Sequence, residues 1–241
     1  YDFIFHCAGY GQPSKFLKYK TSTYKLNSET IMNLKNNLKE NGKFIYMSTT
    51  EIYSGNPKLC LEESIGYTNT NHPRSAYIES KKFGESFIIN CFKSYIIFRV
   101  CLTYGVGAKL NDERVLNQVI LRSIKNKTID VYGGLNQLRS NLYIEDAINM
   151  MVKATIKSSN QIYNINNHQM TTLSKIFNLI GKIAKKKIVN HNAKMKGSPA
   201  VIKISNHKIL KLINFQISNN LNEGLKKTIN WYSDLVNYTR L

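Results

Sequence analysis

The sequence predicts an α/β protein organised around a parallel β-sheet. Three observations support this prediction: short apolar runs recur along the chain, helical periodicity fills the intervals between them, and polar or turn residues directly follow each run. Alternation of strand and helix is typical of a parallel sheet with crossover helices. The 241 residues, 42% of them hydrophobic, suffice for a buried core and exclude a mainly disordered chain.

The first two strands are expected near the start of the sequence, with a helix between them. Phe3–Cys7 is predicted as a buried strand that ends in a turn over residues 8–11. Residues 24–40 carry apolar side chains at helical spacing, which predicts one continuous helix. Phe44–Met47 is the second predicted strand, and the polar segment Ser48–Glu51 follows it.

A further helix and strand follow a loop rich in Asn, Pro and Gly over residues 54–74. We predict this helix over residues 76–92 and the strand over Tyr95–Val100. Beyond Gly105 the alternation is less regular; we expect helices over 113–125, 145–157, 173–184 and 221–235, and extended segments over 128–132 and 161–165. Thr171 and Thr172 can cap the helix that begins at residue 173, and residues 190–198 are expected to form a polar loop.

The net charge of +19 indicates mainly a solvated surface rich in Lys. The Lys residues are spread along the chain with one tight run at residues 185–187, whereas nucleic-acid interfaces favour clustered Arg and stacking aromatic residues. We therefore expect no nucleic-acid partner, although the surplus charge could attract anionic substrates. The apolar runs are far shorter than the roughly 20 residues of a membrane helix, so no membrane partner is expected. Four Cys without ligand spacing and five scattered His predict no metal site, and free thiols in a reducing, cytoplasmic compartment.

Tyr77 and Lys81 are the central candidates for chemistry. They stand four positions apart on a predicted helix, so the phenol and the ammonium share one face. A nearby cation favours the phenolate, which is expected to lower the pKa of Tyr77 towards the working range of a general base. The pair alone is also compatible with an ordinary exposed helix face, because Tyr and Lys are both abundant in this chain.

Polar or turn residues at three consecutive strand ends strengthen the assignment. Ser48 and Thr49 end the second strand, and Arg99 and residues 103–105 lie at the end of the third. Ligands of open parallel sheets bind in the crevice outside the carboxyl ends of the strands. We expect His6, at the end of the first strand, to be a packed histidine. Asp146 is expected either to cap a helix or to touch a ligand. Cys7 and Cys101, which follow predicted strands, are expected to be small core residues.

These motifs, taken in order, make the sequence resemble the extended short-chain dehydrogenases/reductases that act on nucleotide sugars, in the epimerase/dehydratase family. The similarity covers nearly the whole chain and rests on residues 5–9, Asn27 at the opening of a helix, 48–53, 73–82, 99–105, 112–115, 131–133, 139–146 and 221–231. It implies a Rossmann-like doubly wound parallel sheet, missing its first strands, with a smaller C-terminal α/β substrate lobe. The expected division is residues 1–105 for the NAD-binding domain and 106–241 for the lobe, with 161–166 returning a strand to the sheet.

The resemblance also implies roles for individual residues. It is strongest to UDP-glucuronate decarboxylases, with dTDP-glucose 4,6-dehydratases sharing much of it, and it implies NAD as cofactor, a nucleotide-sugar substrate and a homodimer. Thr49 would be the hydroxyl partner of the base Tyr77, and Lys81 would hold the nicotinamide ribose. Glu51 would assist the step after oxidation. Ala8 and Gly9 would contact the cofactor. Arg114 and Arg139 would bind the nucleotide diphosphate.

Three departures from the family pattern are visible. The Gly-x-x-Gly-x-x-Gly loop and the acidic residue after the second family strand are absent, so roughly 60 residues are expected before Tyr1 and little NAD affinity is expected without them. Leu102 replaces an Asn beside the substrate, and residues 198–204 lack the Arg of decarboxylases. Epimerisation or dehydration therefore stay open as the reaction. A truncated remnant that only binds a partner or nucleotide sugar is a rival hypothesis, and a basic nucleic-acid-binding module is a third.

Overall fold

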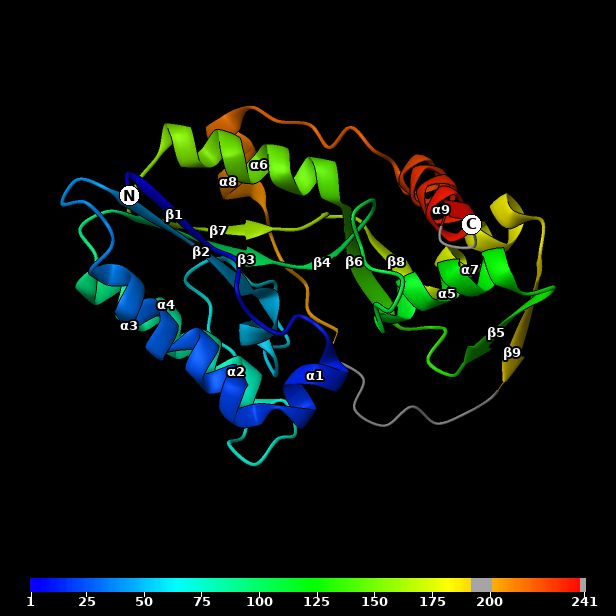
Figure 1. Cartoon of the computed structure of the whole chain (residues 1–241), viewed down its shortest axis with the longest axis horizontal. Helices are drawn as coiled ribbons and strands as arrows, with labels where there is room; N and C mark the ends of the chain where they lie inside the picture. Colours follow the sequence, from blue (N-terminus) through cyan, green and yellow to red (C-terminus); the bar gives the residue numbers. More distant parts are fainter. Residues whose placement is uncertain (192–200, 239–241) are drawn as a thin grey trace. The chain divides into compact units, whose positions relative to one another are not determined.

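The computed structural model describes residues 1–191 and 201–238, which form two compact units (Figure 1). Unit 1 comprises residues 1–101, 149–166 and 202–216, and unit 2 comprises 102–148, 167–201 and 217–241. Each unit is built from separate stretches of the chain. Among the described residues, no helix has the length and apolar character needed to span a membrane.

Unit 1 contains a four-stranded, fully parallel sheet in the order β1-β2-β3-β7. Its strands are β1 (Phe3–His6), β2 (Lys43–Thr49), β3 (Tyr95–Val100) and β7 (Gln161–Ile165). The two central strands are almost continuously apolar and buried, as strands covered on both faces must be. This arrangement confirms the predicted Rossmann-like α/β class.

Helices cover both faces of this sheet. One face carries α2 (Lys20–Asn27), α3 (Glu29–Lys35) and α4 (Ser75–Cys91), and its core joins Ile31, Phe44, Tyr46, Ile88 and Ile97. On the other side lie residues 149–157 of α6 (Ile144–Lys157) and α8 (His207–Ile213) (Figure 1). Two short elements complete this unit, α1 (Pro13–Lys18) and the 3₁₀ turn η1 (Thr50–Tyr53).

The prediction of a single helix over residues 24–40 is wrong. The chain is already helical from Lys20, breaks at Ser28, and resumes as α3, which ends at Lys35. The Ser28 hydroxyl donates to the Tyr24 carbonyl oxygen at 2.7 Å, and its backbone angles (φ −130°, ψ −78°) are not helical. Ser competes in this way with the helical ladder. Asn27 consequently ends a helix instead of opening one.

The described part of unit 2 combines two small sheets with helices. The sheets are β4-β6-β8, from Leu102–Tyr104, Leu138–Tyr143 and Met170–Thr172, and β5-β9, from Thr128–Tyr132 and Lys187–His191. The helices α5 (Val115–Lys125), α7 (Leu173–Ala184) and α9 (Leu221–Tyr238) pack around a core that includes Val119, Ile180 and Leu225. Thr172 caps α7 as expected, accepting from the Lys175 amide. The polar loop expected over residues 190–198 begins inside β9, and its residues 192–198 lie outside the described ones.

Candidate active site

Thr49, Glu51, Tyr77 and Lys81 all belong to unit 1. Thr49 is the last residue of β2 and the N-cap of η1, where its hydroxyl oxygen accepts from the Glu51 amide at 3.2 Å. Tyr77 lies in the first turn of α4, and Lys81 one helical turn later. The carboxyl end of β2 and the start of α4 thus bring together the side chains that the sequence singled out.

The Tyr77 phenol is buried, with 9% of the residue exposed. Burial, followed by the Glu51 carboxylate, raises the pKa of Tyr77 to about 12, and a hydrogen bond with the Thr49 side chain and the charge of Arg74 offset this only in part. The expected lowering of this pKa is therefore wrong for this structure, because desolvation outweighs the nearby cations. At neutral pH Tyr77 carries its proton.

Phe16, which the sequence did not single out, forms one wall of the Tyr77 site. Its ring stacks on the Tyr77 ring, with centroids 4.5 Å apart and planes 9° apart, and the Arg74 guanidinium lies 4.8 Å from the centre of the Phe16 ring. Phe16 comes from α1, which Pro13 opens at the first helical positions. No periodicity distinguishes a six-residue helix, so only the fold shows this contact.

Buried Arg74 and partly buried Glu51 form an ion pair next to Tyr77. The Arg74 Nε donates to one Glu51 carboxylate oxygen at 2.7 Å, and its Nη2 donates to the other. This two-pronged contact fixes the carboxylate plane. Arg74 lies within residues 73–82, one of the segments on which the family resemblance rests. The sequence therefore pointed to this segment, but it assigned no role to Arg74.

Lys81 is buried, and its ammonium is aimed at the end of the sheet. Its Nζ donates to the Met47 carbonyl oxygen at 2.7 Å and lies 4.6 Å from the centre of the Tyr46 ring. Burial lowers the pKa of Lys81 to about 8, and the Glu85 carboxylate counteracts this. A Cβ built on Gly9 would lie 3.6 Å from the Nζ, which places the turn after β1 beside the ammonium.

The turn after β1 exposes little side-chain bulk. Ala8 and Gly9 are exposed, and so is Cys7, which corrects the expectation that Cys7 is a core residue. Cys101 is half-buried. His6 is buried against the rings of Phe44 and Tyr46, as expected for a packed histidine, but neither of its ring nitrogens has a hydrogen-bond partner within the described residues.

Both Arg114 and Arg139 belong to unit 2. Arg114 precedes α5 and forms an ion pair with Asp112, its Nη2 donating to the carboxylate at 2.6 Å. Arg139 lies buried in β6. Its guanidinium donates to the Leu138 carbonyl and to the Gln137 side chain. The sequence pattern missed this strand because β6 shows no alternation of apolar and polar residues: three consecutive polar residues form its middle.

Asp146 is neither a helix cap nor exposed. It lies within α6, which begins at Ile144, and is fully buried in unit 2. Its carboxylate oxygens accept hydrogen bonds from the backbone and side chains of Ser218 and Asn219. This set of donors gives Asp146 a structural role in holding the segment before α9.

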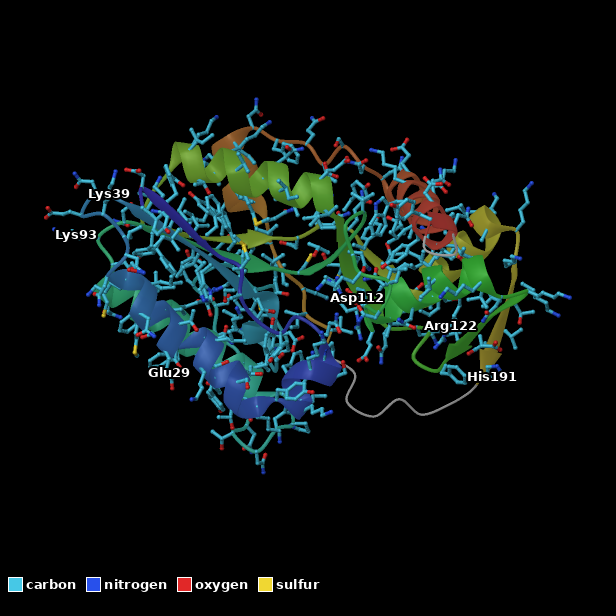
Figure 2. The ribbon with its side chains drawn as sticks, viewed as in Figure 1. Glu29, Lys39, Lys93, Asp112, Arg122 and His191 are labelled. Atoms are coloured by element: carbon cyan, nitrogen blue, oxygen red, sulfur yellow. The ribbon has the colours of Figure 1, made fainter. Side chains whose placement is uncertain are left out.

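Much of the positive charge lies on exposed side chains. Lys39 and Lys93 project outward from unit 1, where they pair with Asp2 and Glu40 at 2.9 and 2.5 Å (Figure 2). Both pairs are more than half exposed, so they contribute little to stability. Within the described part of the chain, no group of three His, Cys, Asp or Glu side chains is arranged to hold a metal ion.

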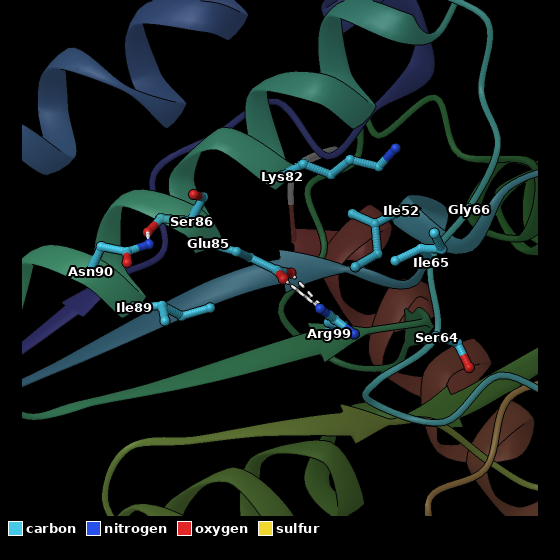
Figure 3. A pocket seen from close by; sticks show the side chains of 10 residues that line it. All are labelled: Ile52, Ser64, Ile65, Gly66, Lys82, Glu85, Ser86, Ile89, Asn90 and Arg99. Atoms are coloured by element: carbon cyan, nitrogen blue, oxygen red, sulfur yellow. Dashed lines mark hydrogen bonds and ion pairs between the residues drawn. The ribbon is translucent and has the colours of Figure 1, made fainter.

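A pocket of about 260 Å³ opens on the side of α4 that carries Glu85, Ser86 and Ile89 (Figure 3). Tyr77 and Lys81 are not part of its lining. Glu85 and Arg99 point toward one another across it from α4 and β3, joined by hydrogen bonds of 2.6–3.2 Å (Figure 3). Arg99 is thus engaged in a buried ion pair at the end of β3.

The fold and the Tyr77–Lys81 site define a class of Rossmann-like proteins with a Tyr-x-x-x-Lys helix. A family model described as the NAD dependent epimerase/dehydratase family matches residues 1–166, and the chain belongs to this family. UDP-glucuronic acid decarboxylase 1 of Danio rerio is 26% identical over 240 residues, which cover 96% of this chain and 57% of that protein. dTDP-glucose 4,6-dehydratase of Salmonella typhimurium is 26% identical over 215 residues, covering 80% of this chain and 59% of that protein. The chain thus spans a little over half the length of these relatives.

Solved structures show the same fold. UDP-glucose 4-epimerase of Thermotoga maritima, solved with UDP-glucose, superimposes with a TM-score of 0.85 at 21% identity, covering 98% of this chain and 78% of the other. A mutant UDP-glucuronic acid 4-epimerase of Bacillus cereus, solved with UDP-4-deoxy-4-fluoro-glucuronic acid and NAD, gives a TM-score of 0.82 at 20% identity, covering 97% of this chain and 76% of the other.

Proposed function

We propose that the protein of which these residues form part is an NAD-dependent enzyme that modifies a nucleotide sugar through a 4-keto intermediate. The observation that carries the proposal is the arrangement of three side chains: the Thr49 side chain at the end of β2 acts on the Tyr77 phenol at the start of α4, and Lys81 follows Tyr77 by one helical turn with its ammonium anchored on β2. A hydroxyl, a proton-transferring phenol and a fixed cation are the groups that oxidation of a sugar alcohol requires.

The residues near Lys81 fit the nicotinamide ribose of NAD. The ammonium has three donors, and the Met47 carbonyl uses one of them. The adjoining turn exposes Ala8 and Gly9, whose small side chains leave room for a flat ring and a sugar. Lys81 would hold the ribose hydroxyls, and Ala8 and Gly9 would contact the ring. NAD supplies a reversible hydride acceptor when it is bound.

The chain's own residues would manage the protons. Tyr77 accepts the proton of the sugar C4 hydroxyl, and Thr49 orients that hydroxyl through its contact with the phenol. Because the pKa of Tyr77 is about 12, phenolate formation depends on added positive charge in the occupied site. Glu51, held in place by Arg74, is positioned to accept or return a proton at a neighbouring carbon after the 4-ketone forms.

Decarboxylation of UDP-glucuronate is the reaction we favour, with 4,6-dehydration or epimerisation as the alternatives. Two relatives whose alignments each cover 96% of this chain, from Danio rerio and Xenopus tropicalis, are named UDP-glucuronic acid decarboxylase 1. Arg114 and Arg139 in unit 2 would bind the nucleotide diphosphate, since guanidinium matches phosphate in two-pronged contacts. The homodimer forms part of the same proposal, supported by large apolar side chains exposed on the covering helices, Met32 and Phe83.

The test uses the full-length protein with Tyr77→Phe as the variant and the exposed Tyr24→Phe as the matched control. Loss of a positioned acid–base group should lower turnover of the nucleotide sugar by about 100-fold or more, while Tyr24→Phe keeps wild-type activity. Mass spectrometry of the product separates loss of carbon dioxide from loss of water or no mass change. Turnover by Tyr77→Phe at the wild-type rate would refute the role of Tyr77. Tight sugar binding without turnover in the wild type would support the non-catalytic remnant instead.

A further inference from the structure

The pocket beside α4 lies entirely within unit 1, and its lining includes neither Tyr77 nor Lys81 (Figure 3). Its volume of about 260 Å³ is slightly below the range of about 300–1,000 Å³ that is typical of ligand sites. Since one water molecule occupies about 30 Å³ in the liquid, the space suits a ligand of roughly eight non-hydrogen atoms. The pocket can therefore hold a small organic molecule, but it is too small for a nucleotide sugar.

Isoleucine side chains form the apolar part of the pocket. Ile65, from the loop before α4, and Ile89, from α4 itself, lie on opposite sides of the pair formed by Glu85 and Arg99 (Figure 3). Ile65 is 63% exposed and Ile89 is 41% exposed, whereas Ile52, which also lines the pocket, is buried. Removing apolar surface from water is favourable, so the two exposed isoleucines favour a ligand with an aliphatic part.

The buried guanidinium of Arg99 has a hydrogen-bond donor to spare at this pocket. Of its five N–H groups, the Nε donates to Glu85 at 3.1 and 3.2 Å, and one Nη2 hydrogen is donated to Glu85 at 2.6 Å. The two Nη1 hydrogens go to the Tyr53 hydroxyl at 2.6 Å and the Glu62 carbonyl at 2.7 Å. The second Nη2 hydrogen has no acceptor among the residues that the structure describes. A buried donor without an acceptor is costly, so this part of the pocket favours a ligand oxygen.

The charges that line the pocket favour an anion. The Glu85 carboxylate is engaged by Arg99 and by the Ser48 hydroxyl, so the charges of Glu85 and Arg99 compensate one another. Lys82 adds a further positive charge to the lining. Its ammonium pairs with Glu79 at 3.0 Å, but both side chains are about one third exposed and Glu79 is not part of the lining. Such exposed pairs are weak, and two hydrogens of the ammonium remain for a ligand.

We propose that this pocket binds a small carboxylate with a branched aliphatic chain, at a site separate from the candidate active site. The alkyl part lies between Ile65 and Ile89. The carboxylate accepts one hydrogen bond from the Nη2 of Arg99 and another from the Lys82 ammonium, and contacts of this charge-assisted kind are the strong ones. The inference does not depend on the proposed function, because none of these four residues is assigned to NAD or to the nucleotide sugar.

Methyl NMR of the full-length protein, labelled at the isoleucine δ1 methyl groups, tests the binding without cofactor or substrate. The Ile65 and Ile89 signals are assigned by their loss in Ile65→Val and Ile89→Val. Potassium 4-methylpentanoate, which has the size of the pocket, should shift both signals saturably with a Kd of about 1 mM or below. The uncharged 4-methylpentanamide should bind about tenfold more weakly or worse, since it lacks the charge-assisted contacts. Acetate, which lacks the chain, and potassium chloride should give no saturable shift.

A variant at the edge of the buried ion pair tests the polar contact without disturbing that pair. Lys82→Gln should raise the Kd of 4-methylpentanoate about two- to fivefold, which is the scale of one exposed charged contact. Lys93→Gln is the matched control, because Lys93 is exposed and does not line the pocket, and it should leave the Kd unchanged. Equal affinity for the carboxylate and the amide would overturn the inference. No saturable shift up to about 20 mM would overturn it as well, and is the result expected if water or a second copy of the protein fills the pocket.

Discussion

Replacing Gly84 by Ala should destabilise the protein, although Ala is the better helix former. Gly84 lies in the interior of α4, where the intrinsic preference for Ala over Gly is about 1 kcal/mol. A Cβ at this position would lie 2.6 Å from the Tyr46 hydroxyl oxygen, 2.9 Å from the Ile31 Cδ1 and 3.0 Å from the Asn27 carbonyl oxygen. These atoms belong to buried side chains and to backbone, so they have little freedom to move.

The cost of forcing a methyl group into a packed interior is about 1–3 kcal/mol. The contacts at Gly84 involve three separate elements, α2, α3 and β2, so we expect the upper part of that range. Subtracting the gain in helix propensity leaves a net loss of about 1–2 kcal/mol in the free energy of unfolding. For a chain of this size that loss corresponds to a fall in Tm of roughly 2–8 °C.

Thermal and urea unfolding of Gly84→Ala and wild type, followed by circular dichroism, measure the effect. Gly11→Ala is the control, because a Cβ there meets no atom within 4 Å. It should change the free energy of unfolding by no more than about 0.5 kcal/mol. Gly84→Ala should also displace the Lys81 ammonium, because this ammonium lies 4.6 Å from the centre of the Tyr46 ring. A variant as stable as the wild type would show that α2 and α4 are not packed as closely as described.

Two further predictions concern His6 and Arg139. The pKa of His6 is lowered to about 4, below its usual 6.5, so the unfolded chain binds more protons between these values and stability should fall as the pH drops from 6.5 to 4, by at most about 3 kcal/mol. His6→Phe should remove this part of the acid sensitivity in urea unfolding at about pH 7 and pH 5, and an unchanged difference would contradict the burial of a neutral His6. Arg139→Lys should weaken nucleotide-sugar binding to the full-length protein about tenfold in calorimetry, since one charged hydrogen bond is worth about 1.5–3 kcal/mol. Lys186→Ala is its control, and equal weakening by both would indicate diffuse attraction instead of an Arg site.

The central strands of unit 1 were predictable because they are buried on both faces, whereas β1, which was expected to be buried, exposes Phe3 and Phe5. Tyr95–Val100 is predicted and observed with the same ends, since a continuous apolar run bounded by turn residues has few other interpretations. The strands of unit 2 were harder to predict. β4, β6 and β8 have three to six residues each and mixed polarity, so their pairing depends on partners far along the chain.

The candidate site likewise has parts that the sequence predicts and parts that only the folded structure shows. The spacing of Tyr77 and Lys81 predicted a shared face from helix geometry alone, and the polar end of β2 predicted that Thr49 lies nearby. The stacking of Phe16 on Tyr77 joins residues 61 positions apart through a helix too short to leave a pattern. Glu85 shares the helix with Lys81, but its burial follows from the position of Arg99 on β3. Desolvation, which reverses the expected pKa shift of Tyr77, is likewise a property of the packed structure.

The assembly of unit 1 from separated stretches has a consequence for synthesis on the ribosome. β3 pairs with β7, and Cys60 forms a parallel bridge with Ile204, so neither partner exists when β3 first leaves the exit tunnel. About 60 residues separate β3 from β7, which is roughly 3–12 s of translation at about 5–20 residues per second. During that interval one long edge of a strongly apolar strand is unpaired, and such edges template aggregation. The nascent protein should therefore depend on chaperones until β7 has emerged, and slowing translation after residue 100 should lower its soluble yield.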